Sequence, residues 1–149
     1  MYLERAIKLA NENVDAGGSP FGAVLVLDDV IIGEGVNETH IIHDISGHAE
    51  LLAIRMAQKA LGRIDLSGSI MYASGHPCPM CLGAIAFSGI ESVVYANSLE
   101  EAASVGLGLS KDIYSYLSGN VDAIQLKMHH QEIGDASVNP MLRLKNRTL

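Results

Sequence analysis

Residues 69–89, SIMYASGHPCPMCLGAIAFSG, contain both cysteines of the chain, Cys78 and Cys81. The first six residues are apolar on both faces, which predicts a central strand of a sheet. The segment after them predicts a helix capped by Cys78, because Pro79 suits the first helical position, where its missing N–H would be unpaired anyway. Both sulfurs would lie near the positive end of the helix dipole, which favours thiolates. Three interpretations remain open: a redox pair, half of a metal site, or two buried thiols.

The pattern around this unit predicts an α/β fold. Apolar periodicity indicates helices over residues 3–16, 47–62 and 98–106, a β-hairpin over 21–37, strands over 91–96 and 121–128, and a partly helical tail. A hairpin followed by alternating helices and strands predicts a three-layer α-β-α sandwich with a mixed central sheet. With 149 residues, residues 1–149 are expected to form a single domain.

The composition limits the cellular setting. The chain has no run of 18 or more apolar residues, so no membrane span is predicted. Its N-terminus carries Glu4, Glu12 and Asp15 and indicates an amphipathic helix rather than a signal peptide. We therefore expect a cytoplasmic, reducing location, where a cysteine pair is more often catalytic or metal-binding than structural.

The charge balance limits the partners. The net charge is −7, from 10 basic and 17 acidic residues. Binding a polyanion needs clustered Lys and Arg, and the only cluster is C-terminal: Arg143, Lys145 and Arg147. The balance argues against nucleic acid and favours a small-molecule partner.

A second helix start supplies the chemistry that the cysteines lack. In SGHAELLAI, residues 46–54, His48 and Glu50 begin a predicted helix with Ser46 or Gly47 as its cap. One imidazole and two thiolates make three zinc ligands and leave a fourth position open, the pattern of a catalytic site. Glu50 is then free to move protons. A redox pair would leave His48 and Glu50 unexplained.

These residues resemble a known group of enzymes. His48-Ala49-Glu50 followed by Pro-Cys-x-x-Cys at residues 77–81 resembles the signature of the zinc-dependent cytidine/nucleobase deaminase superfamily. SPFGAVLV from residue 19, GVN ending at Asn37, and PCPMCLGAI resemble its guanine deaminase and tRNA adenosine deaminase branch. The resemblance covers roughly residues 1–107 and is consistent with the predicted fold.

The resemblance implies a role for each matching residue. His48, Cys78 and Cys81 would hold one Zn²⁺ per chain, and Glu50 would move protons in a hydrolytic deamination that releases ammonia. Asn37 would hydrogen-bond the ring of the substrate, and the backbone around Gly22 and Ala23 would line the pocket. His76 does not match the family pattern, but its place two residues before Cys78 leads us to expect a contact with the substrate.

The resemblance also bears on the substrate. Guanine is expected first, with Asp112 or Glu101 accepting hydrogen bonds from its N–H donors. Two departures keep other substrates open: His76 stands where relatives usually carry glutamate, and the sequence after Gln131 has no aromatic residue. The alternatives are cytosine or another free base or nucleoside, adenosine in tRNA, and a non-catalytic module folded around zinc. Such a module would have no use for Glu50.

The resemblance implies assembly as well. Members of this branch are generally homodimers, in some cases with an exchanged C-terminal segment, here the segment from about residue 120. The mean hydropathy of +0.23 and the apolar helix with Leu82, Ile85 and Phe87 favour a homodimer.

Overall fold

A mixed sheet of four strands forms the centre of the molecule. The computed structural model describes residues 1–131 and 139–147. The strands are β1 (Gly22–Leu27), β2 (Val30–Val36), β3 (Ile70–Gly75) and β4 (Ser92–Asn97), in the order β2-β1-β3-β4. Strand β1 is antiparallel to both neighbours, whereas β3 and β4 are parallel. The predicted mixed sheet and the internal position of β3 are therefore confirmed.

The predicted hairpin joins β1 to β2 directly. Asp28 and Asp29 form the turn with φ angles of 49° and 62°. Two consecutive positive φ angles are typical of the tight turn whose twist matches that of paired strands. Asp tolerates this left-handed conformation better than most residues because its short side chain bonds locally.

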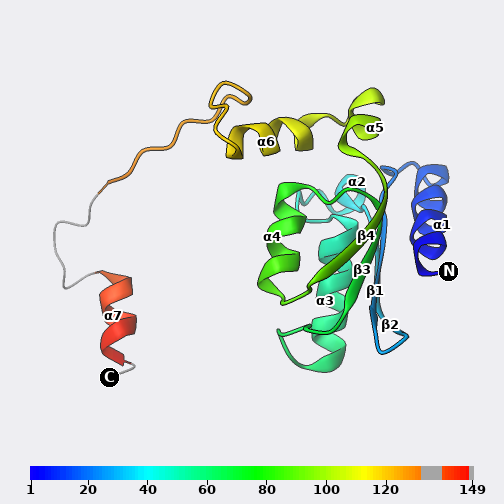
Figure 1. The fold of residues 1–149 in the computed structure, drawn as a ribbon, viewed down its shortest axis with the longest axis horizontal. Helices are drawn as coiled ribbons and strands as arrows, with labels where there is room; N and C mark the ends of the chain where they lie inside the picture. The colour runs from blue at the N-terminus through cyan, green and yellow to red at the C-terminus, as the bar shows by residue number, and fades with distance from the viewer. Residues whose placement is uncertain (132–138, 148–149) are drawn as a thin grey trace.

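Helices cover both faces of the sheet (Figure 1). Helix α1 (Tyr2–Asp15) packs on β1 and β3 from one side. On the other side lie α3 (Ala49–Leu61) and α4 (Pro79–Phe87). This arrangement is the predicted three-layer α-β-α sandwich. The remaining helices are α2 (Thr39–Ile42), α5 (Leu99–Ser104), α6 (Leu109–Leu117) and α7 (Pro140–Arg147).

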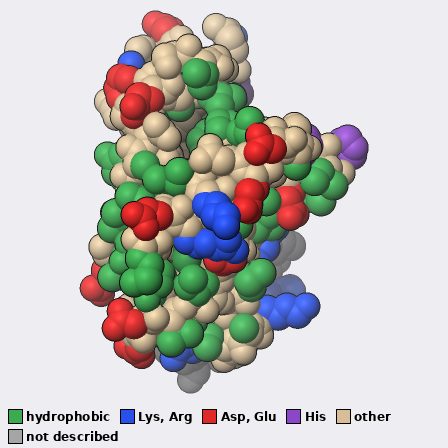
Figure 2. Space-filling view, turned by 90° about the vertical axis from the view of Figure 1, so that its right-hand side faces the viewer, with side chains coloured by type: hydrophobic (Ala, Val, Ile, Leu, Met, Phe, Trp, Pro, Cys, Tyr) green, Lys and Arg blue, Asp and Glu red, His purple; other side chains and the backbone are tan. Residues whose placement is uncertain are grey.

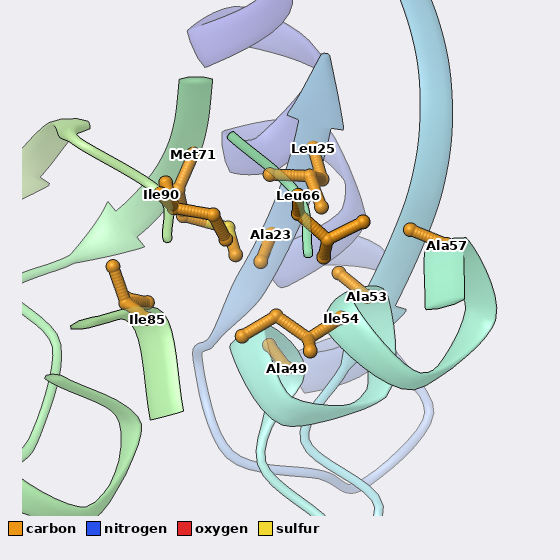
Figure 3. Close-up of a cluster of buried hydrophobic side chains, with 10 residues drawn as sticks. All are labelled: Ala23, Leu25, Ala49, Ala53, Ile54, Ala57, Leu66, Met71, Ile85 and Ile90. Atoms are coloured by element: carbon orange, nitrogen blue, oxygen red, sulfur yellow. The ribbon is translucent and has the colours of Figure 1, made fainter. Parts of the chain in front are cut away.

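Small residues bring α3 unusually close to the sheet. Ala49, Ala53 and Ala57 are fully buried on α3. A Cβ atom added to Gly33 or Gly35 of β2 would overlap the backbone of α3, at the carbonyl oxygens of Ala53 and Ala49 respectively. The main core lies between α3, α4 and the sheet (Figure 3); its buried members are Ala23, Leu25, Ala49, Ala53, Ile54, Ala57, Leu66, Met71, Ile85 and Ile90.

The chain leaves this domain after α6 (Figure 1). The strand predicted over residues 121–128 is not formed in the protomer, where the segment consists of turns, bends and irregular backbone. The segment meets no strand edge, so its backbone lacks the pairing that a strand needs. Helices α2 and α6 were not predicted. Within the described ranges, no helix combines the length and apolarity that crossing a membrane requires.

Candidate zinc and substrate site

The N-termini of α3 and α4 supply the predicted metal ligands. Cys78 is the N-cap of α4, as predicted, and its sulfur accepts a hydrogen bond from the backbone N–H of Cys81 at 3.4 Å. The cap of α3 is His48 itself, so the prediction of Ser46 or Gly47 was wrong. With φ −83° and ψ 149°, His48 has extended backbone, which lets its ring reach beyond the helix end.

The spacing of the three donor atoms fits zinc. His48 Nδ1 lies 3.5 Å from Cys78 Sγ and 3.6 Å from Cys81 Sγ. Tetrahedral zinc with Zn–N and Zn–S bonds of about 2.0–2.1 and 2.3 Å places nitrogen and sulfur about 3.6 Å apart. All three donors lie within 4.8 Å of one another, so His48, Cys78 and Cys81 could together hold a zinc ion.

The two sulfurs differ in their affinity for protons. A side-chain hydrogen bond from the Cys81 thiol lowers the pKa of Cys78 to about 4, against the opposing effect of burial. The same bond, together with burial, raises the pKa of Cys81. The pKa of His48 is raised, mainly by its hydrogen bond to Cys78. Cys78 therefore favours the thiolate form beside the imidazole of His48, and a thiolate next to an imidazole is a donor set suited to a metal cation.

Glu50 follows these ligands in the first turn of α3. It is only 6% exposed, yet it is one of the residues that line the adjacent cavity. Burial raises the pKa of its carboxyl group, because desolvation disfavours the charged form.

A cavity of about 540 Å³ opens beside the zinc ligands. Its volume is in the range typical of small-molecule sites. Its walls come from the loop before β1, the loops after β2, β3 and β4, and helices α3 to α6; they include Phe21, Asn37, Ile45, His48, Glu50, His76, Cys78, Asn97, Leu99, Leu107, Leu109, Ser110 and Ile113.

Asn37 presents a defined group to this cavity. Its Oδ1 accepts hydrogen bonds from the backbone N–H of Thr39 at 3.2 Å and from Thr39 Oγ1 at 2.8 Å. The backbone N–H of Thr39 can donate to the oxygen of the Asn37 amide but not to its NH₂ group, so this bond fixes which way the amide is turned. The side-chain NH₂ of Asn37 is therefore left as a pair of donors.

His76 lies against two tyrosines. Its ring makes edge-on contacts with Tyr95, at 4.8 Å between centroids, and with Tyr114 of α6, at 5.4 Å. The Tyr114 hydroxyl donates to the backbone carbonyl of Pro77 at 2.6 Å, and burial raises the pKa of Tyr114 to about 12. Helix α6 is thereby anchored to the loop that carries Cys78.

Three predicted contact residues lie elsewhere. Gly22 and Ala23 are buried in β1 and do not line the cavity, although the neighbouring Phe21 does. Asp112 is exposed on α6 and is not a lining residue.

Ser110, one turn before Tyr114 on α6, lines the cavity instead. In the described part of the chain, its hydroxyl is the one buried side-chain oxygen or nitrogen without a hydrogen-bond partner. Sequence reasoning missed it because α6 was not predicted. The helical spacing of Leu109, Ile113 and Tyr116 was the signal that could have identified this helix.

Comparison with known proteins agrees with this site. Residues 1–97 match the model of the cytidine and deoxycytidylate deaminase zinc-binding region. A guanine deaminase of Bacillus subtilis is 49% identical over 106 residues, 70% of this chain and 68% of that protein. A tRNA-specific adenosine deaminase of Agrobacterium fabrum is 33% identical over 141 residues, 88% of this chain and 93% of that protein.

The fold gives the same relationship. The crystal structure of a guanine deaminase from Bacillus subtilis superposes with a TM-score of 0.88 and 38% identity, over 97% of this chain and 92% of that one. The match over residues 1–97 includes Glu50 and the three residues whose geometry suits zinc, His48, Cys78 and Cys81. The chain belongs to the cytidine and deoxycytidylate deaminase zinc-binding family and is a zinc-dependent deaminase.

Proposed function

We propose that this protein hydrolyses guanine to xanthine and ammonia. The observation that carries the proposal is the similarity to guanine deaminase over almost the whole fold, at a TM-score of 0.88. The cavity beside the zinc ligands, about 540 Å³ with mainly apolar walls, is large enough for a free purine.

Each residue of the site has a part in this reaction. His48, Cys78 and Cys81 would hold the zinc ion, which when bound would lower the pKa of water and so supply a nucleophile near neutral pH. Glu50 takes a proton from the attacking water and passes it to the ring nitrogen beside the carbon that bears the amine. Glu50 then protonates the departing amine, so that water is consumed and ammonia leaves.

The surroundings of Glu50 support this role. A carboxyl group that stayed fully ionised near neutral pH would be a poor proton donor. Burial raises its pKa and brings the group closer to the range in which it both accepts and donates a proton. The side-chain NH₂ of Asn37 supports a substrate contact, since its donors are directed by the bonds from Thr39 and match acceptor atoms of a purine.

A tRNA adenosine deaminase is the second candidate, because the Agrobacterium fabrum protein matches 88% of the chain. The charge distribution favours a free base. None of the described residues that line the cavity is Lys or Arg. On the face that carries α1, basic side chains form small groups among acidic ones rather than a continuous track (Figure 2). Cytosine and nucleosides remain further alternatives.

We also propose that the protein is a cytoplasmic homodimer that exchanges its C-terminal segment. The outer edge of β4 has no neighbouring strand among the described residues, and Val94 and Tyr95 are 38% and 45% exposed. Residues 121–128, VDAIQLKM, lie beyond the domain with Leu126 and Met128 exposed. This segment is suited to pair with β4 of a second copy. Part of the exchanged region, residues 132–138, lies outside the described residues.

The test of the proposed function is ammonia release by the zinc-loaded protein. Guanine, cytosine, adenine, their nucleosides and tRNA are compared by kcat/KM, with Cys81→Ala as the metal-deficient control. We expect guanine to have the highest kcat/KM and Cys81→Ala to lose zinc together with activity. A higher value for tRNA or cytosine would overturn guanine as the substrate. Release from none of them would favour a non-catalytic zinc module.

A further inference from the structure

The two ring nitrogens of His76 have different surroundings. Nδ1 lies 2.9 Å from the backbone carbonyl oxygen of Pro77. A carbonyl oxygen only accepts, so Nδ1 carries the proton of this hydrogen bond. In the neutral ring, Nε2 then has no hydrogen and is an acceptor.

The packing around His76 holds the ring in this orientation. Tyr95 and Tyr114 both contact it edge-on, and the Tyr114 hydroxyl donates to the same Pro77 carbonyl that accepts from Nδ1. Turning the ring over would place a C–H against that carbonyl and lose the bond. The acceptor is therefore presented in one direction.

Nε2 of His76 is an accessible atom of a residue that lines the cavity. In the described part of the chain, no protein group forms a hydrogen bond with Nε2. Ser110 Oγ is the one buried side-chain oxygen or nitrogen there without a partner, so Nε2 is not buried. His76 itself lines the cavity, two residues before the ligand Cys78. The acceptor consequently lies near the reacting end of the pocket.

We propose that His76 determines substrate specificity by accepting a hydrogen bond at Nε2 from a ring N–H of the base. The inference rests on the proposed guanine deamination and deepens it. Guanine offers two such donors, N1–H and N9–H. The NH₂ of Asn37 donates and His76 accepts, so the pocket matches a heterocycle that carries both an acceptor and a ring N–H. A base methylated at the nitrogen in question loses this contact.

The experiment compares two substitutions of His76 against three substrates. His76→Asn keeps a donor close to the position of Nδ1 and has no atom at the position of Nε2, whereas His76→Gln reaches that position with an amide oxygen. The kcat and KM are measured for guanine, 1-methylguanine and 9-methylguanine, with zinc content recorded for each protein. The matched control is His43→Asn, at an exposed residue outside the cavity whose positive φ Asn tolerates.

We expect His76→Asn to lower kcat/KM for guanine about 10- to 100-fold with full zinc content, the usual effect of losing a buried hydrogen bond. His76→Gln should recover part of this loss. The parent protein should discriminate against one methylated guanine, and His76→Asn should no longer do so. The methyl position that behaves in this way identifies the donor as N1–H or N9–H.

Three results would overturn the role of His76. One is an unchanged kcat/KM for guanine in His76→Asn. Another is an equal loss for guanine and both methylated bases, and the third is loss of zinc in His76→Asn. If the parent protein does not use guanine but deaminates another base, guanine fails as the substrate, and the same comparison with N-methyl derivatives of that base tests His76 separately.

Discussion

At the scale of single residues, Glu50 is the buried acidic side chain of the site: it is almost fully buried, yet it lines the cavity together with His48. An ionised carboxylate in such a place costs free energy, because the protein solvates it less well than water does. A residue serving only packing would be cheaper as an apolar side chain. The burial of Glu50 is therefore best explained by its chemistry.

Glu50→Gln tests that explanation. The amide has the same shape but moves no proton, so we expect kcat to fall about 10²- to 10⁴-fold. Zinc content and melting temperature should be maintained, because the substitution removes no ligand and no buried charge partner. Steady-state kinetics, metal analysis and thermal denaturation measure the three quantities. An active protein depleted of zinc would instead make Glu50 a ligand.

The residues that carry the metal were predictable from the sequence because their spacing is local. Cys78, Pro79 and Cys81 lie within one helical turn, and His48 and Glu50 lie in another. Ser110 and Tyr114 were not predictable, because their roles depend on where α6 packs after a loop. Asp112 was expected at the pocket but lies on the exposed side of the same helix.

At the scale of elements, the approach of α3 to β2 sets where His48 and Glu50 lie. Glycines in β2 leave room for the backbone of α3, which a side chain would fill. The alternating glycines of VIIGEGV were visible in the sequence. The sequence did not show why these glycines are needed, because the backbone of α3 that they approach is distant from them along the chain.

Gly35→Ala should therefore destabilise the protein. Its methyl group would overlap the carbonyl oxygen of Ala49, next to His48, and we expect a loss of about 1–3 kcal/mol. Gly83→Ala is the control, since this α4 glycine has no atom within 4 Å of an added Cβ and should gain about 0.5–1 kcal/mol from helix propensity. Chemical denaturation gives both values. Equal effects would show that the α3–β2 contact tolerates a methyl group.

The ion pair between α1 and β2 should make stability depend on pH. Arg5 Nε and Nη2 donate to the two oxygens of Glu34 at 2.8 and 2.9 Å, and this lowers the pKa of Glu34 below its ordinary 4.5. A lowered folded-state pKa stabilises the fold above about pH 4.5, and the contribution disappears as pH falls through the folded-state value.

Glu34→Gln should cost about 0.5–1 kcal/mol at pH 7, a small value because the pair is partly exposed. The difference from the parent protein should shrink as the pH falls below 4.5. Urea denaturation across this pH range measures it, with Glu12→Gln on the exposed side of α1 as control. A difference that stays constant with pH would assign the effect to packing.

At the scale of the whole molecule, the described protomer has more apolar surface than its own core covers. Phe87 of α4 is 92% exposed, and Leu109 and Leu117 of α6 are 65% and 66% exposed. The strand predicted over residues 121–128 is not formed in the described chain, where the segment consists of turns, bends and irregular backbone. A sequence pattern can indicate that a segment favours pairing as a β-strand, but it does not indicate whether the partner strand belongs to the same chain or to a second copy.

Ile124→Asp with Leu126→Asp tests the exchanged homodimer. These side chains share one face of the segment when it is extended, so two charges on that face should oppose pairing with β4. Sedimentation should show a dimer for the parent protein and a monomer for the double variant at micromolar concentration. Lys127→Asp, on the other face, should remain dimeric. A dimer in all three proteins would place the interface elsewhere.

The proposed pairing at the free edge of β4 would also make catalysis depend on protein concentration. Residues 121–128 follow shortly after α6, the helix that contributes Ser110 and Ile113 to the pocket. Docking of this segment on a second copy would restrict the motion of α6. By mass action, the fraction of docked chains would fall when the protein is diluted. Activity per chain should thus decrease below the dissociation constant of the dimer and return on concentration. A newly synthesised chain would become a competent catalyst only after it meets another.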